Sequence, residues 1–373
     1  MIPFNKPYLT GKEILHIQDA LQCRKFSGDG GFTKKCQDFF HDTLGFRKTL
    51  LTTSCTDALE MAAILVDIKP GDEVIVPSYT FVSTANAFAL RGAKIVFADS
   101  LSDQPNIDPA EIAKLITKKT KAIVVVHYAG VACDMDEIKK LTTSSNISLI
   151  EDAAQGIDSY YKGAPLGTLG DLAAFSFHET KNIICGEGGL ISINNPDYDL
   201  RSEIIREKGT NRSSFFRGEV DKYGWVDVGS SFLPSDILAA FLFAQLEDIK
   251  EIQSQRQRVW NRYFDNFSRV SKQKSIGLPV IPEYAANNAH MFYILCNSLD
   301  QRTRVIKSLK ENDILAVFHY QSLHSSPYFS NLHDGRELIN SDRYTDCLLR
   351  LPLFPELKDN EIDKICEIVL TCV

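Results

Sequence analysis

The chain has 373 residues, 44% hydrophobic and 24% charged, which is enough to bury a large core and to form more than one domain. Its formal net charge of −7 argues against a broad basic surface for nucleic acid or anionic membranes. No stretch approaches the roughly 20 apolar residues needed to span a bilayer. Nine cysteines without a CxxC pair favour reduced thiols over a metal site. We therefore expect a cytoplasmic globular protein without a metal.

Two helical patterns, at 13–21 and 33–44, flank a glycine-rich turn at 27–31. From about residue 48 to 200, short apolar runs alternate with longer amphipathic ones. This alternation predicts an α/β domain whose largely parallel sheet is covered by helices on both faces. Ligands of such sheets bind at the carboxyl ends of the strands. The expected strands are 48–53, 72–77, 93–99, 121–127, 147–152, 172–177 and 189–193.

The segment 207–231 is polar, aromatic and rich in turn residues, and it is too long for a simple connection. Long irregular segments inside compact domains are often lids or binding loops. A single helix is expected at about 234–271, and we place a domain boundary near residue 250. The predicted domains are a large α/β domain, 1–250, and a smaller α+β domain, 251–373. In the smaller domain we expect strands at 291–296 and 315–320 and helices near 301–311 and 358–370.

Polar residues follow several of the expected strands. Asp152 ends the apolar run ISLIED, where it is either a functional carboxylate or a helix N-cap. Ser54, Cys55 and Thr56 begin a helix after a strand, where backbone N–H groups and the helix dipole favour an anion, although simple N-capping explains them equally well. His127 ends another strand, and a structural histidine is at least as good an explanation for it.

Phe81, with Tyr79, stands at the start of the next expected helix, where an aromatic ring packs in the core or stacks on a planar ligand. Lys181 lies between the strand LAAFSF and the glycine-rich run GEGG. An isolated lysine in such a place is usually a solvated turn residue. An amine held among apolar strands, however, loses its proton more easily and becomes a nucleophile.

Taken together, these residues match the needs of pyridoxal 5′-phosphate (PLP). That cofactor requires a lysine for its aldehyde, a carboxylate for its pyridine nitrogen, an anion site for its phosphate and an aromatic face for its ring. Lys181, Asp152, the segment at Thr56 and Phe81 supply one of each.

Several ordered motifs carry a family resemblance across nearly the whole chain: SCTDALEMA, PSYTFVSTANAF, VHYAGVACDMD, EDAAQ, SFHETKN and GEGG. The sequence resembles the DegT family of PLP-dependent nucleotide-sugar aminotransferases, which have the aspartate aminotransferase fold (fold type I). The segments MIPFN, FHETKN, FFRGEVDKYGW and GSSFLPSD are most similar to the subgroup of dTDP-4-amino-4,6-dideoxygalactose transaminases. Such enzymes move an amino group from L-glutamate to C4 of dTDP-4-keto-6-deoxyglucose, for polysaccharide antigens of the bacterial surface.

The resemblance implies roles for particular residues. Lys181 corresponds to the lysine that holds the cofactor, and Asp152 to the partner of the pyridine nitrogen. Gln155 corresponds to a contact near the ring's 3-hydroxyl, and Phe81 to the stacking residue. Cys55, Thr56 and Ser176 correspond to the phosphate site.

Two positions depart from the common family pattern. Ser54-Cys55-Thr56 stands where SGT is usual, so the phosphate site lacks a glycine. GSSFL replaces GYNxR, which leaves Ser231 in place of an asparagine that reaches the phosphate of the neighbouring subunit. The resemblance also implies a homodimer with shared active sites.

The segment 209–225 is the candidate for binding the diphosphate of a sugar nucleotide, with charge pairing from basic residues and packing from aromatic ones. His324 is a further candidate from the smaller domain. Alternatives remain: the gluco epimer or a 3-amino product, a PLP-dependent sugar dehydratase, or a non-catalytic regulatory protein of the same fold. The candidates in the segment are Arg212, Arg217, Lys222, Tyr223 and Trp225.

Overall fold

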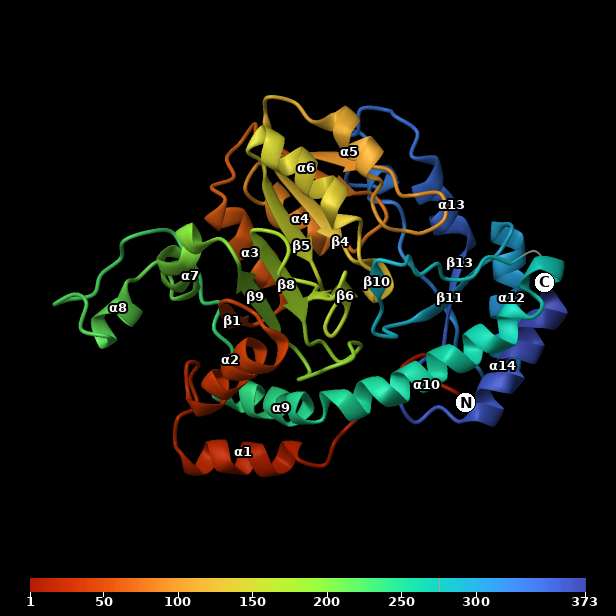
Figure 1. Cartoon of the computed structure of the whole chain (residues 1–373), viewed down its shortest axis with the longest axis horizontal. Coiled ribbons are helices and arrows are strands. Elements are labelled where there is room, and N and C mark those ends of the chain that lie inside the picture. The colour runs from red at the N-terminus through yellow and green to blue at the C-terminus, as the bar shows by residue number, and fades with distance from the viewer. Residues whose placement is uncertain (275) are drawn as a thin grey trace.

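The computed structural model describes residues 1–274 and 276–373, and a seven-stranded sheet forms its centre (Figure 1). The five strands from β8 to β3 are parallel, whereas β9 is antiparallel to both of its neighbours. The predicted α/β class and the largely parallel sheet are confirmed. In sheet order the strands are β1 (Thr49–Thr52), β9 (Gly189–Ile193), β8 (Leu172–Ser176), β5 (Ser148–Asp152), β4 (Thr120–Val126), β2 (Glu73–Pro77) and β3 (Lys94–Ala98).

Helices cover both faces of this sheet, and successive residues of each strand face opposite layers. On β2, Val74 and Val76 pack into the core under α3 (Cys55–Leu65) and α4 (Ser83–Ala89). Ile75 between them packs into a different core with α5 (Pro109–Leu115) and α6 (Met135–Ser145). The period of two along a strand therefore explains why nearly continuous apolar runs form these strands.

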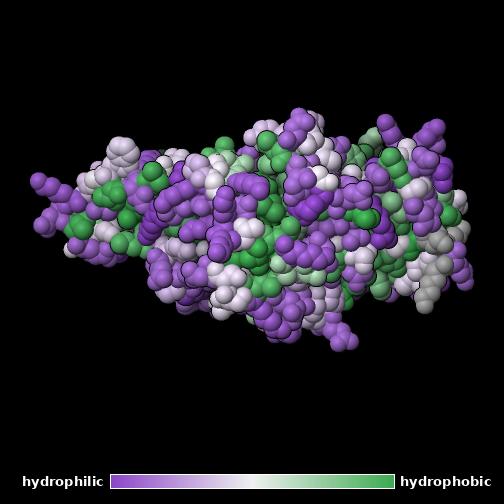
Figure 2. Space-filling view, turned by 90° about the horizontal axis from the view of Figure 1, so that it is seen from above, coloured by the Kyte–Doolittle hydropathy of each residue, from purple (hydrophilic) through white to green (hydrophobic). Residues whose placement is uncertain are grey.

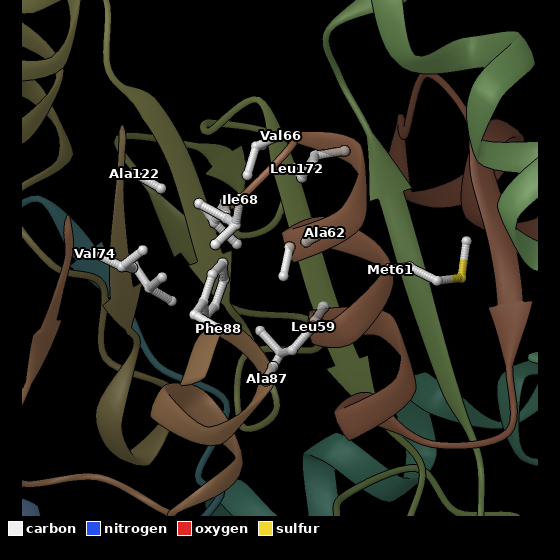
Figure 3. Packing of buried hydrophobic residues seen from close by; sticks show 14 of the residues in the cluster. Leu59, Met61, Ala62, Val66, Ile68, Val74, Ala87, Phe88, Ala122 and Leu172 are labelled. Carbon is white, nitrogen blue, oxygen red and sulfur yellow. The ribbon is translucent and has the colours of Figure 1, made fainter. Parts of the chain in front are cut away.

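The core under α3 and α4 is shown in Figure 3. Phe88 of α4 lies between Leu59 and Ala62 of α3 on one side and Val74 and Ala122 of the sheet on the other. These side chains are buried. Their packing fixes the start of α3 and of α4 relative to the ends of the strands.

The prediction of a single helix at 234–271 is wrong. The chain forms α9 (Asp236–Glu247) and α10 (Ile249–Ser268) with a break at Asp248. Asp248 has φ −107° and ψ 16°, outside the helical region, and its carboxylate accepts a hydrogen bond from Lys12 Nζ at 2.7 Å. The two helices still run end to end beneath the sheet (Figure 1).

A second, antiparallel sheet has β13 (Leu348–Leu351) between β11 (Phe292–Leu295) and β12 (Val317–Phe318). It shares an apolar core with α10, α12 (Leu299–Glu311) and α14 (Asp359–Cys372). The sequence indicated β11 and β12 but not β13, whose run LLRL is short and interrupted by an arginine. The division at residue 250 stays a prediction.

The remaining elements are short or peripheral, and no helix among the described residues is long and apolar enough to cross a membrane. A small sheet joins β10 (Ala285–Ala286) to β6 (Tyr160–Tyr161) and β7 (Ala164–Pro165). The other helices are α1 (Glu13–Gln22), α2 (Gly31–Leu44), α7 (Asp199–Arg206), α8 (Arg212–Phe216), α11 (Ser271–Lys274) and α13 (Ile339–Cys347), with 3₁₀ turns η1 (Tyr128–Gly130), η2 (Pro196–Tyr198) and η3 (Leu323–Ser325).

Candidate active site

A cavity of about 840 Å³ lies where the carboxyl ends of the parallel strands meet the smaller sheet. Val126, Asp152 and Ser176 line it from the ends of β4, β5 and β8. The start of α3 and the connection between β8 and β9 also line it, and the smaller sheet contributes residues of β12 and β13. The placement agrees with the rule that open α/β sheets bind ligands at the carboxyl ends of their strands.

Lys181 lines this cavity from the β8–β9 connection. Its backbone N–H donates to the His178 carbonyl at 2.9 Å, which forms a tight turn in a connection that reverses the chain between two antiparallel strands. Burial lowers the pKa of the Lys181 amine, and the charge of Arg350 lowers it further against the opposing effects of Cys55 and Asp152. The amine therefore reaches its neutral, nucleophilic form at a lower pH than an ordinary lysine.

Asp152 is only 5% exposed and ends β5 at the same cavity. Its Oδ2 accepts a hydrogen bond from Thr84 Oγ1 at 2.7 Å, and its Oδ1 accepts from the Ala154 N–H at 3.1 Å. Burial raises the pKa of this carboxyl, although these donors and Lys181 oppose the shift. No cation of residues 1–274 or 276–373 forms an ion pair with this carboxylate, and a protonated pyridine nitrogen would be a suitable partner for it.

The start of α3 is the candidate anion site. Ser54 caps the helix, its Oγ accepting from the Asp57 N–H at 3.0 Å, and the N–H groups of Cys55 and Thr56 have no preceding helical turn to bond. Thr56 Oγ1 is 2.8 Å from Ser83 Oγ. The residues of this group that line the cavity are Ser54, Cys55, Thr56 and Ser83. Cys55 is held as a neutral thiol, since burial raises its pKa.

The glycine run after Lys181 allows the start of α3 to lie against the start of β9. A Cβ on Gly189 would lie 2.3 Å from the Ser54 carbonyl carbon and 2.5 Å from Cys55 N. A side chain at this position would therefore displace the backbone of the anion site. Glycine is required here because two segments of the chain, the start of β9 and the start of α3, lie very close together.

The other predicted cofactor residues line the same cavity, with the exception of Ser231. The ring of Phe81 is 56% exposed and lies 6.1 Å from that of Tyr320. Gln155 is buried, accepts from the Ala129 N–H at 2.6 Å and donates to Tyr320 Oη at 3.1 Å. Ser176 lies at the end of β8.

These residues fit PLP. The cavity combines an amine whose pKa is lowered, a buried carboxylate that pairs with no cation of the described residues, the N–H groups of a helix start, and an accessible aromatic ring. A phosphate suits the helix start, because its N–H groups and dipole favour negative charge.

The candidates of the segment 207–231 do not line the cavity of this chain. The helix α8 lies at the end of the molecule opposite to α12 and α14 (Figure 1). Seen from above, apolar side chains lie among polar ones at that end (Figure 2), and Trp225 is 82% exposed. The residues concerned, all exposed, are Arg212, Arg217, Lys222, Tyr223, Trp225 and Ser231.

His324 also lies outside the cavity. It is buried, and its Nδ1 is 2.7 Å from Ser78 Oγ. His127 is fully buried, with its Nε2 2.9 Å from Glu151 Oε2 and its Nδ1 accepting from the Cys133 N–H. Within this chain both imidazoles connect one segment to another.

Sequence reasoning missed several cavity residues from distant parts of the chain, and also Thr84, which bonds Asp152 from behind the cavity lining. The cavity residues concerned are Phe4, Asn5, His290, His319, Tyr320 and Arg350. Asn182 Nδ2 donates to Gln253 Oε1 and to the Asn288 carbonyl, so its Oδ1 must accept from His290 Nδ1 at 2.8 Å. Burial lowers the pKa of His290 well below its ordinary value, so the ring is neutral and its Nε2 is an acceptor. The only local signal was Asn182 itself, directly after Lys181.

The fold and the site together define a fold type I PLP-dependent enzyme. The model of the DegT/DnrJ/EryC1/StrS aminotransferase family matches residues 7–370, and the chain belongs to this family. It is therefore an aminotransferase whose cofactor is PLP.

Individual relatives are similar to this chain over nearly its whole length. The Methanocaldococcus jannaschii protein MJ1066 is 30% identical over 370 residues, which cover 97% of this chain and 95% of the relative. Spr1654 from Streptococcus pneumoniae, solved in a PMP form, is 26% identical with a TM-score of 0.91, covering 100% of this chain and 99% of the other. A PLP form of Spr1654 has a TM-score of 0.89, at 27% identity and with 100% and 98% coverage. The aminotransferase TlmJ from Streptoalloteichus hindustanus is 25% identical with a TM-score of 0.91, at 100% and 98% coverage.

Proposed function

We propose that this aminotransferase moves the amino group of L-glutamate to C4 of dTDP-4-keto-6-deoxyglucose. The product would be dTDP-4-amino-4,6-dideoxygalactose, for a surface polysaccharide such as an O-antigen or enterobacterial common antigen. The observation that carries the amino transfer is the meeting of Lys181, Asp152 and the start of α3 in one cavity. The description of Spr1654 as a sugar aminotransferase supports a sugar acceptor. The motifs similar to those of the dTDP-4-amino-4,6-dideoxygalactose transaminases support this particular one.

The residues of the chain have separable tasks. When bound, PLP supplies an aldehyde that takes up the amino group and a ring that accepts electrons from the reacting carbon. Once its amine is free, Lys181 would take the proton from Cα of the amino donor and deliver it to C4′, the aldehyde carbon of the cofactor. Asp152 holds the proton on the pyridine nitrogen, and Thr84 holds Asp152 in position. The start of α3 anchors the phosphate.

A groove next to the cavity is a candidate site for part of the sugar nucleotide. It has a volume of about 500 Å³ and shares Thr80, Phe81 and Tyr320 with the cavity. Tyr328 and Phe329 also line it, so that a flat base or a sugar ring can pack on aromatic faces.

The basic and aromatic residues of 209–225 are proposed to act in trans. They are exposed at one end of the molecule and do not line the cavity of their own chain. In a homodimer with shared sites, the same segment and Ser231 of one chain would complete the site of the other. Light scattering at several concentrations tests whether a dimer forms.

The decisive experiment combines the cofactor spectrum with product analysis. Purified holoprotein should be yellow, lose its colour with L-glutamate, and carry a phosphopyridoxyl group on Lys181 after borohydride reduction. NMR of the product from dTDP-4-keto-6-deoxyglucose should show nitrogen at C4 and the H4 couplings of the galacto configuration.

Other outcomes select the alternatives. Gluco couplings identify the epimer, and nitrogen at C3 identifies a 3-aminotransferase. A deoxygenated sugar identifies a dehydratase. A protein that binds PLP but is not decolourised by any amino donor is a regulatory relative of the family.

A further inference from the structure

Tyr320 stands where two hollows of the molecule meet. It lines both the cavity of about 840 Å³ and the neighbouring groove of about 500 Å³, and the other residues common to both are Thr80 and Phe81. The Thr84 hydroxyl donates to Asp152, so the hydrogen of Thr80 Oγ1 points to Thr84 Oγ1 at 2.9 Å. Phe81 is apolar. Neither of these two side chains offers a donor hydrogen at the junction, which leaves the Tyr320 hydroxyl.

The backbone of Tyr320 has an unusual conformation. Its φ of 46° lies in the left-handed region, which an aromatic residue rarely adopts. The preceding residue is fixed on two sides, because the buried Tyr79 hydroxyl donates to the His319 carbonyl and the buried Tyr128 Oη lies 2.8 Å from His319 Nδ1. Such backbone persists only where the surroundings enforce it, and it is concentrated at ligand sites. The placement of the Tyr320 ring is therefore imposed by its neighbours.

The direction of the Tyr320 hydroxyl follows from Gln155. Gln155 Oε1 accepts from the Ala129 N–H at 2.6 Å, and the NH₂ group at the other end of the amide donates to Tyr320 Oη at 3.1 Å. Because Oη accepts there, its own hydrogen points away from Gln155, and no acceptor in residues 1–274 or 276–373 bonds it. Burial raises the pKa of the Tyr320 phenol, so it stays protonated and remains a donor. Tyr320 thus presents an unpaired O–H to a ligand at the junction.

The junction lies between the reacting end and the nucleotide end of the proposed substrate. Lys181 lines the cavity, and the groove is the candidate site for part of the sugar nucleotide. The sugar ring connects the two, so the atoms next to its ketone pass Tyr320. The ketone oxygen at C4 is lost in the transfer, and C5 carries a methyl group. The hydroxyl at C3 is the neighbouring acceptor that both substrate and product keep.

We propose that Tyr320 donates a hydrogen bond to the C3 hydroxyl of the keto sugar and so selects acceptors that carry a hydroxyl beside the ketone. It acts as a specificity-determining residue and takes no part in moving the transferred proton. The proposal rests on the proposed amino transfer to a 4-keto sugar. An oriented donor without a partner in the described chain discriminates strongly, because an analogue without the hydroxyl leaves the O–H unpaired.

The test compares two acceptors in the second half of the reaction. The pyridoxamine-phosphate form of the holoenzyme is mixed with dTDP-4-keto-6-deoxyglucose or with its 3-deoxy analogue, and the return of the yellow colour gives kcat/KM. Wild type should prefer the hydroxylated sugar about 100-fold, within the range for leaving one polar group unpaired. Tyr320→Phe should lower kcat/KM for that sugar about 30-fold and change the value for the analogue less than about threefold.

A binding measurement gives a readout that does not depend on turnover. The sugar nucleotide dTDP-6-deoxygalactose has the C3 hydroxyl but no ketone, so it cannot react. Calorimetry with the PLP-loaded protein should give a Kd about tenfold higher for Tyr320→Phe than for wild type. The affinity of the apoprotein for PLP and the rate of decolourisation by L-glutamate should change less than about threefold, because neither involves the sugar.

Tyr160 provides a matched control. It is also half-buried, its Oη donates to Asp158 Oδ1 at 2.7 Å, and it lines neither the cavity nor the groove. Tyr160→Phe should keep both the preference for the hydroxylated sugar and the Kd for dTDP-6-deoxygalactose. A preference lost equally in both variants would overturn the proposal.

Other outcomes would overturn it as well. An undiminished preference in Tyr320→Phe would remove the residue from the sugar site, and a loss of PLP affinity or of decolourisation by glutamate would place its hydroxyl at the cofactor. Failure of the proposed function is distinguished in the wild type. If it forms no amino sugar from the hydroxylated ketone, the proposed substrate is wrong and the role of Tyr320 falls with it, whereas equal reaction with both ketones overturns the role of Tyr320 alone.

Discussion

Thr84 Oγ1 donates a hydrogen bond to Asp152 Oδ2 at 2.7 Å, although Thr84 lies on α4 and Asp152 ends β5. Both side chains are buried. Thr84 Oγ1 is also 2.9 Å from Thr80 Oγ1, so the hydroxyl is oriented by the loop before α4. The carboxylate proposed to face the pyridine nitrogen is thus oriented by a residue 68 positions away.

Thr84→Val should weaken PLP binding. Loss of the donor leaves Asp152 with one hydrogen bond and raises the pKa of its carboxyl further, which disfavours the charged form that the pyridine requires. We expect the Kd for PLP to rise about tenfold, the value of one hydrogen bond to a charged group. Absorbance titration of the apoprotein measures it. Thr84→Ser, which keeps the hydroxyl, should bind as wild type does, and equal weakening in both variants would contradict the assigned role.

Gly189→Ala should disturb the anion site without touching a cofactor-binding side chain. The added methyl would meet the Ser54 and Cys55 backbone at 2.3 to 2.5 Å, so the start of α3 must shift. We expect a stability loss of about 2 kcal/mol, typical of overpacking, together with weaker PLP binding. Urea denaturation and PLP titration measure the two effects.

Gly31→Ala is the control for that substitution. Gly31 begins α2, and a Cβ there has nothing within 4 Å. It should be neutral or slightly stabilising, because alanine favours a helix more than glycine does. A normal PLP affinity in Gly189→Ala would show that α3 tolerates the shift.

Glu151→Gln should destabilise the protein strongly. The buried carboxylate accepts from the N–H groups of Gly167, Leu169 and Gly170 at 2.6 to 2.8 Å and lies 2.9 Å from His127 Nε2. An amide cannot accept at both ends, so at least one N–H loses its partner. We expect a loss of about 3 kcal/mol, the scale of breaking a buried charged network.

The pH dependence of Glu151→Gln has a definite sign. Burial would raise the pKa of Glu151, but His127 and the N–H donors outweigh burial and lower it. A carboxyl with a lowered folded-state pKa contributes its full stability above its unfolded pKa, about 4.3, and loses it as the pH falls toward the folded value. The difference from wild type should therefore be largest near neutrality and shrink below about pH 4.

An exposed pair provides the control for Glu151. Glu356 accepts from Lys6 Nζ at 2.8 Å on the surface. Glu356→Gln should change the unfolding free energy by less than about 1 kcal/mol at any pH. A similar small effect for Glu151→Gln in urea denaturation would contradict the network.

Arg212 and Arg217 should differ in their effect on sugar-nucleotide binding. Arg217 already donates to Glu203 and Glu219 at 2.6 to 3.1 Å, whereas Arg212 has only the Phe216 ring, 5.1 Å from its Cζ, as a described partner. Arg212→Ala should raise KM for the sugar nucleotide about tenfold through loss of a phosphate contact. Arg217→Ala should raise it less, and the reverse order would remove Arg212 from the proposed site.

Much of the fold follows from local patterns. Period-two and period-3.6 apolar spacing places the seven strands of the main sheet within a residue or two, because each run must bury one or both faces. The direction of β9 and the helix break at Asp248 could not be predicted from these local patterns. Strand direction depends on which neighbour pairs with it. The residue at the break, Asp248, is bonded by Lys12, which lies far away in the chain.

For the site, the sequence by itself determined the residues that sit on strand ends and helix starts. Lys181, Asp152, Thr56 and Phe81 meet because the carboxyl ends of parallel strands share one edge of a sheet. Only the tertiary structure decided the opposite wall. Arg350, His290 and Phe4 reach the cavity because the smaller sheet and the N-terminal segment pack over that edge, and no local pattern of apolar and polar residues records such long-range packing.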